Sequence, residues 1–177
     1  RCPRRRYIPR MTVERLDASR FGFDSQCFVC NTENARGLQV PFFHDSDREV
    51  VFADFELSPA FSGAPSYVHG GATLALIDEA MSWTTIAIGG KFAFTQETNA
   101  RFDWPVRIGR AYRVEARLTS ADERRMVTDA VELDGQGRAC VTATRTAARR
   151  ELRQATDARG PTNEDHPPTP DPPPTPP

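Results

Sequence analysis

The chain has 177 residues and a formal net charge of −1. Its two ends are poor in apolar side chains: five of the first ten residues are arginine, and residues 151–177 hold nine of the fifteen prolines. Such segments bury too little apolar surface to offset the entropy lost when they become ordered. The composition therefore predicts one domain of ordinary size and excludes a multidomain protein.

We place the domain boundaries where the composition changes. Residues 1–20 are expected to form a disordered or weakly ordered basic arm, residues 21–149 the folded domain, and residues 150–177 a disordered proline-rich tail. Met11 offers a translation start that would make the first ten residues an upstream read-through. The tail could present a polyproline II ligand, although a solvated tail explains it more simply.

The charge and hydropathy patterns exclude several classes of partner. Residues 11–150 carry sixteen basic and nineteen acidic groups, and an acidic domain argues against nucleic acid. No apolar run approaches the roughly 20 residues of a membrane span. Four cysteines in a chain of this size do not make a disulfide scaffold. We expect a cytoplasmic protein with neither a nucleic-acid nor a membrane partner.

The first half of the domain contains two strand patterns and a loop. Residues 38–43 predict an edge strand, because Pro41 cannot donate a hydrogen bond to a ladder. Residues 49–57 alternate apolar and polar side chains as a half-buried strand does. Proline, glycine and serine then mark a loop that ends near Ser66.

A helix and four more strands follow. Between Gly70-Gly71 and Gly89-Gly90, about seventeen residues are apolar nearly all round, which predicts a buried helix. The later strand patterns cover residues 92–104, 110–120, 125–133 and 138–147. This order predicts an α+β fold in which an antiparallel sheet wraps around one long central helix.

Asp78 and Glu79 stand in the middle of the predicted helix. Carboxylates are seldom buried without a partner, because their desolvation is costly. Neighbouring helical positions point about 100° apart, so these two side chains cannot share one environment. Either one is a structural carboxylate or one of them serves a functional site.

His69-Gly70-Gly71 directly precedes the helix. Glycines there leave the N–H groups of the first turn open to a ligand, and the helix dipole favours negative charge at that end. Such a terminus can stabilise an oxyanion.

These motifs together resemble the hotdog-fold acyl-CoA thioesterases of the phenylacetyl-CoA type. Asp78 follows His69 by nine residues, as in the family's HGG motif and catalytic Asp. Residues 27–31, Cys-Phe-Val-Cys-Asn, are similar to the leader of several members, and residues 95–102 look like the family's third strand. The resemblance covers residues 27–147.

The resemblance implies a role for each matching residue. Asp78 would activate water against a thioester carbonyl, or attack it as a nucleophile. The backbone N–H of Gly70, helped by that of Gly71, would polarise this carbonyl. Thr95 matches a residue that orients the water in some members, and His69 would shape the entry to the helix.

The resemblance also implies an acyl-CoA substrate, no separate cofactor and no metal. We expect the substrate to contact four further residues: Ser66, Asn99, Arg101 and Arg107. The family often has Asn six residues before the HGG histidine, where this chain has Gly63. That departure leaves a non-catalytic acyl-CoA-binding module as an alternative. A hotdog hydratase or dehydratase is disfavoured, because it would need a catalytic histidine in another motif.

Helix geometry limits how Gly70 and Asp78 can act together. They are eight residues apart, which is about 12 Å along one helix. A thioester carbonyl needs its donor and its attacking water each within roughly 3 Å. If both residues act, they come from different subunits, which predicts a homodimer or a dimer of dimers with shared sites.

Cys27 and Cys30 form a single CxxC pair. A structural zinc site needs four ligands, and no second pair exists in the sequence. Packed thiols are the simplest interpretation, with zinc binding and redox exchange as alternatives.

Overall fold

The computed structural model describes residues 12–22 and 25–149, and the rest of the two terminal segments lies outside these ranges. Most of the described chain forms one antiparallel sheet of seven strands, in the order β1-β2-β3-β7-β8-β9-β6. These strands are β1 (Val13–Arg15), β2 (Phe43–Asp45), β3 (Val50–Glu56), β6 (Ala93–Phe102), β7 (Ala111–Ala121), β8 (Arg125–Asp134) and β9 (Ala139–Arg149). The smaller elements are η1 (Ala18–Phe21), η2 (Pro59–Phe61), β4 (Ser62–Ala64) and β5 (Tyr67–Val68).

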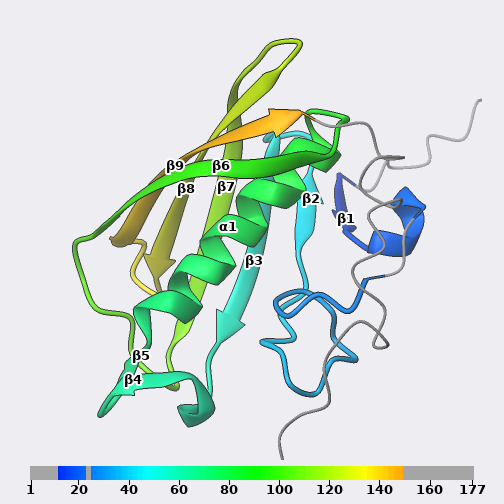
Figure 1. Cartoon of the computed structure of the whole chain (residues 1–177). Helices are drawn as coiled ribbons and strands as arrows, with labels where there is room; N and C mark the ends of the chain where they lie inside the picture. Colours follow the sequence, from blue (N-terminus) through cyan, green and yellow to red (C-terminus); the bar gives the residue numbers. More distant parts are fainter. Residues whose placement is uncertain (1–11, 23–24, 150–177) are drawn as a thin grey trace, which may run out of the picture.

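One long helix, α1 (Gly70–Ala87), lies against one face of this sheet (Figure 1). The helix packs against β3, β6, β7, β8 and β9. Leu76, Ile77, Ala80 and Met81 are fully buried between the helix and the sheet. The prediction of a sheet wrapped around one central helix is confirmed, and this is the architecture of a hotdog fold.

The predicted helix and the four strands after it are also confirmed. Periodicity identified them because each is long: β7, for example, buries Tyr112, Val114 and Ala116 on one face and leaves the residues between them partly exposed. The helix ends before Gly89, where an added Cβ would lie 2.3 Å from the Met126 methyl carbon.

The predicted edge strand over residues 38–43 is wrong except at its last residue. Residues 38–40 instead run beside the 28–29 segment, where the Leu38 N–H donates to Phe28 O and the Val40 N–H to Val29 O. Gln39 has a φ of 56°, and Pro41 has no N–H, so this stretch cannot continue a regular ladder. Only Phe43 enters β2.

Part of the expected N-terminal arm lies on the sheet. β1 pairs with β2, and the Leu16 N–H donates to Phe42 O at 2.9 Å. Leu16 is only 5% exposed, so its apolar side chain contributes to the core. The ordered domain thus includes residues before 21. The rest of the arm, residues 1–11, and the proline-rich tail lie outside the described residues.

Candidate active site

Asp78 and Glu79 point in different directions from the middle of α1. Asp78 faces β6, where the Thr95 hydroxyl donates a 2.9 Å hydrogen bond to Asp78 Oδ1. Glu79 faces the loop before β2, and its Oε1 lies 3.4 Å from Cys27 Sγ. The Asp78 side chain is 42% exposed, so water can reach it. Of the two carboxylates, Asp78 therefore has the polar, accessible environment that catalysis requires.

Arg145 on β9 completes the surroundings of Asp78, and sequence reasoning missed it. Its Nε lies 3.6 Å from Asp78 Oδ1, and its Nη2 donates to Ala93 O at 3.1 Å. The Arg145 side chain is 1% exposed, and burial lowers its pKa. The signal was available: Arg145 falls between Ala143 and Ala147 on the buried face of β9, where an apolar residue is expected.

The start of α1 is capped by His69. Its Nδ1 accepts a 2.9 Å hydrogen bond from the Gly71 N–H and so caps the helix. The Gly71 N–H is therefore already engaged and is a poor second donor for a carbonyl, contrary to the expected help from Gly71. Within the described part of the chain, the Gly70 N–H has no hydrogen-bond partner. Gly70 is thus the donor that the helix start leaves open.

A cavity of about 350 Å³ lies at this helix start. Its lining includes Gly70 and Thr73 of the helix, Phe102 at the end of β6, and Trp104 just after that strand. Phe102 and Trp104 are about half exposed, although both are large and apolar. The cavity gives the open N–H of Gly70 an apolar neighbourhood.

Two of the four predicted substrate contacts lie near this end of the helix. Tyr67, which starts β5 beside Ser66, forms a bridge with Arg107, and the Arg107 guanidinium lies 5.3 Å from the centre of the Tyr67 ring. Ser66 O accepts a hydrogen bond from the Ile108 N–H. β5 leads directly into His69 and α1, so Ser66 and Arg107 approach the Gly70 end.

Asn99 and Arg101 lie elsewhere. They pair with Thr144 and Thr142 of β9, on the face of the sheet opposite to α1. Asn99 donates to Glu97, and Arg101 forms an ion pair with Asp103 at 2.7 Å. Within one subunit, the fold does not bring either residue to Asp78.

Gly63 stands at the position where the resemblance leads us to expect an asparagine, and the backbone is closely packed there. An added Cβ at Gly63 would lie 2.8 Å from the His69 Cα, closer than real Cβ contacts. The β4 strand therefore packs directly on the helix cap, and any side chain at this position would displace His69.

Comparisons with known proteins agree with the hotdog fold and point to thioesterases. Residues 66–141 match the family model of the thioesterase superfamily. The mouse acyl-coenzyme A thioesterase THEM5 is 30% identical over 87 residues, which are 49% of this chain and 34% of that protein. The match over residues 66–141 and the similarity to the mouse protein both support a hotdog thioesterase family.

Solved structures share the fold. A thioesterase superfamily protein, RHA08564, superposes with a TM-score of 0.62 at 27% identity, covering 66% of this chain and 56% of that one. The smu.793 protein of Streptococcus mutans, solved with acetyl-CoA, gives a TM-score of 0.56 at 17% identity and covers 58% and 82%.

The match with the mouse relative spans only about a third of that protein's length. Among the described residues, no helix is long and apolar enough to cross a membrane.

Proposed function

We propose that this protein hydrolyses an acyl-CoA thioester to a free acid and CoA. The observation that carries the proposal is the Asp78 carboxylate, held by the Thr95 hydroxyl at 2.9 Å and still open to water. Acyl-CoA as the substrate class is supported by the name of the mouse relative and by the acetyl-CoA bound to the Streptococcus mutans structure.

In the proposed reaction, Asp78 acts as a general base toward a water molecule. The water oxygen forms a bond to the thioester carbonyl carbon while its proton passes to Asp78. The Gly70 N–H stabilises the negative charge that develops on the carbonyl oxygen. Collapse of the intermediate breaks the C–S bond, and the CoA sulfur leaves as thiolate or takes the proton back.

Both residues can serve one bond if two subunits share each site. β6 is an edge strand of the described sheet, and nearly all of its residues are exposed. A second β6 could pair with it about a two-fold axis. If this axis passes between Thr98 and Asn99, Thr95 of one subunit lies opposite Phe102 of the other.

Such pairing would bring the Asp78 part of the site in one subunit close to the Gly70 part in the other. Thr95 touches Asp78, and a Cβ at Gly70 would lie 3.9 Å from the Phe102 ring. Asp78 of one subunit would thus approach Gly70 of its neighbour, and the dimer would hold two equivalent sites. The exposed rings of Phe94, Phe102 and Trp104 would be covered by the same association.

The test is release of free CoA from a panel of acyl-CoA thioesters by the wild type and by Asp78→Asn. We expect the variant to lose at least about 100-fold in rate, the usual contribution of a general base. Asp47→Asn, an exposed carboxylate in the β2–β3 turn, is the matched control and should keep full activity. Equal rates in Asp78→Asn and the wild type would remove Asp78 from its role. Thioester binding without release by the wild type would favour the acyl-CoA-binding module.

A further inference from the structure

The fold brings a third potential metal ligand to the CxxC pair. One ligand atom from each of Cys27, Cys30 and Glu79 lies within 4.8 Å of the other two. The two cysteines belong to the loop before β2, whereas Glu79 comes from the middle of α1, 52 residues after Cys27. All three side chains are partly buried.

The loop is shaped to present sulfur. The N–H groups of Val29 and Cys30 both point at Cys27 Sγ, at 3.3 and 3.5 Å. Two N–H groups aimed at one sulfur stabilise its thiolate form, which is the form that binds metal. The CxxC turn therefore adopts a ligand-presenting conformation before any ion binds.

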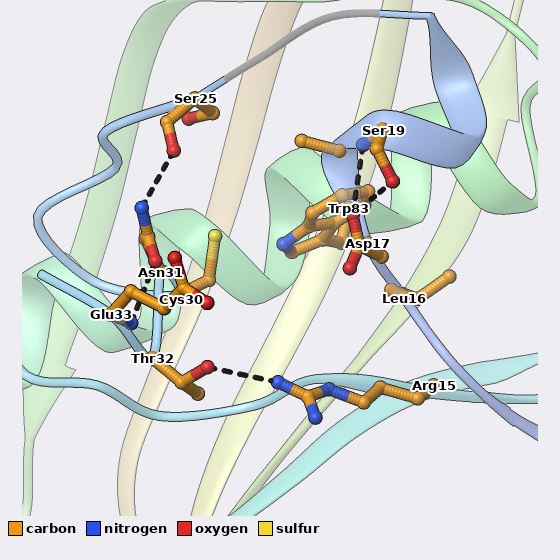
Figure 2. A pocket seen from close by; sticks show the side chains of 11 residues that line it. Arg15, Leu16, Asp17, Ser19, Ser25, Cys30, Asn31, Thr32, Glu33 and Trp83 are labelled. Atoms are coloured by element: carbon orange, nitrogen blue, oxygen red, sulfur yellow. Dashed lines mark hydrogen bonds between the residues drawn. The ribbon is translucent and has the colours of Figure 1, made fainter.

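Contacts outside the turn keep it in place. The Asn31 side chain donates to Ser25 O at 2.9 Å, and Asn34 donates to Gln26 O (Figure 2 shows the Asn31 contact). Gly37 closes the loop, because an added Cβ there would lie 2.3 Å from Phe28 O. A preorganised loop lowers the entropic cost of binding an ion.

We propose that Cys27, Cys30 and Glu79 bind a divalent zinc-like cation. Two thiolates and a carboxylate match the ligand preferences of Zn²⁺, and the thiolates disfavour Mg²⁺ and Ca²⁺. Ligands of a tetrahedral zinc at about 2.0–2.3 Å from the metal lie roughly 3.3–3.8 Å apart. Cys27 Sγ and Glu79 Oε1 already lie 3.4 Å apart, and no other pair exceeds 4.8 Å, so the cluster needs to contract by about 1 Å at most. Side-chain rotation can supply this change.

Water can supply the fourth ligand. Cys30 lines a cavity of about 430 Å³, together with Asn31 and Trp83 (Figure 2). Three protein ligands and one exchangeable position then surround the ion. The ion would offset two of the three negative charges of its ligands and link the 25–37 loop to α1, one residue from Asp78.

The test uses the full chain, kept reduced and stripped of metal, titrated with Co²⁺ as a spectroscopic probe for the zinc site. We expect one equivalent to bind, with a thiolate-to-cobalt charge-transfer band that Zn²⁺ abolishes by displacement. Cys30→Ser should remove about half of this band. Glu79→Gln should keep the band and weaken binding at least about 10-fold, because losing a ligand should cost no less than losing an outer-shell partner does.

Matched controls separate ligation from general effects. Cys140→Ala removes a buried thiol of the sheet and Glu33→Gln an exposed carboxylate of the same loop, and both should bind cobalt as the wild type does. Zn²⁺ should also raise the thermal unfolding temperature of the wild type. This measurement needs no variant, so it tests the proposal even if one of the variants fails to fold. No charge-transfer band in the reduced wild type would overturn the proposal, as would an unchanged band in Cys30→Ser. The proposal would also be overturned if Cys27 and Cys30 formed a disulfide and the reduced pair bound no metal.

Discussion

The Thr95 hydroxyl donates a 2.9 Å hydrogen bond to Asp78 Oδ1 and so joins the start of the edge strand β6 to the middle of the central helix. The bond fixes the direction of a carboxylate whose side chain is 42% exposed. A side chain with this freedom would otherwise sample several rotamers. The edge strand thus orients the proposed base.

Thr95→Val removes this bond and keeps the shape of the side chain. Hydrogen bonds to charged groups are worth about 1.5–3 kcal/mol, so we expect kcat to fall about 10- to 100-fold with little change in KM. Thr95→Ser should restore most of the rate, because it retains the hydroxyl. Steady-state kinetics on one thioester checks this. An equal loss in both variants would contradict a positioning role.

Arg145→Met should lower activity and raise stability. The guanidinium is buried, and its Nε and Nη1 have no hydrogen-bond partner among the described residues. An apolar side chain here removes the cost of desolvating the guanidinium, and the remaining Asp78 carboxylate is 42% exposed and stays in contact with water. Asp78 would lose its neighbouring charge at 3.6 Å, and we expect kcat to fall about 10-fold. Urea unfolding and kinetics measure both effects, with the exposed Arg117→Met as control.

Gly70→Pro tests the helix-start donor without breaking the helix. Proline is favoured at the first helical position, and His69, with φ −62° and ψ 132°, already has the conformation that a residue before proline adopts. The substitution deletes only the open N–H, and we expect at least about a 100-fold loss in kcat. Gly70→Ala keeps the N–H, and its Cβ would fit 3.9 Å from Phe102, so its activity should be near wild type.

Mixed dimers test the shared site. If Gly70 and Asp78 come from different subunits, a dimer of one Gly70→Pro and one Asp78→Asn subunit contains one intact site. Random pairing of equal amounts should then recover about a quarter of the wild-type rate. Co-expression with two different tags allows the mixed species to be purified, and this species alone should show about half of the wild-type rate. A mixed species as inactive as its parents would place both residues in one subunit or outside the reaction.

Glu132 should make the protein less stable as the pH rises. It is fully buried, neither of its oxygens has a hydrogen-bond partner among the described residues, and burial raises its pKa to about 8. The folded state therefore holds a proton that the unfolded state releases near the ordinary glutamate pKa of about 4.3. Stability should fall between about pH 4.5 and pH 8, by up to about 1.4 kcal/mol per pH unit.

Glu132→Gln should flatten this dependence, because the amide does not ionise. Urea unfolding at several pH values compares it with the wild type and with the exposed control Glu56→Gln, which should keep the wild-type slope. If Glu132→Gln kept the wild-type dependence of stability on pH, the proton held by the folded state would belong to another group. Burial and the nearby Cys27 raise the pKa of Glu79 to about 7, which makes Glu79 the first alternative.

The long elements could be predicted from the sequence, because their periodicity is local. Eighteen residues of α1 and the alternating strands after it carry the signal within themselves. The short β1 and β2 carry no such signal, with three residues each, and they form only because a neighbouring strand completes their hydrogen bonds. The predicted edge strand failed because a left-handed Gln39 and Pro41 outweighed its apolar pattern.

The sequence alone determined the central helix, the order of the long strands and the position of Asp78 eight residues after Gly70, because helix spacing converts directly into distance. Only the tertiary structure decided which side chains surround that helix. It brought Arg145 next to Asp78, and it brought Cys27 next to Glu79, which lies 52 residues later in the chain. Spacing cannot encode such contacts, because they depend on how the sheet and the loop pack around α1. The sequence therefore showed one CxxC pair and predicted no metal, and the fold supplied the third potential ligand.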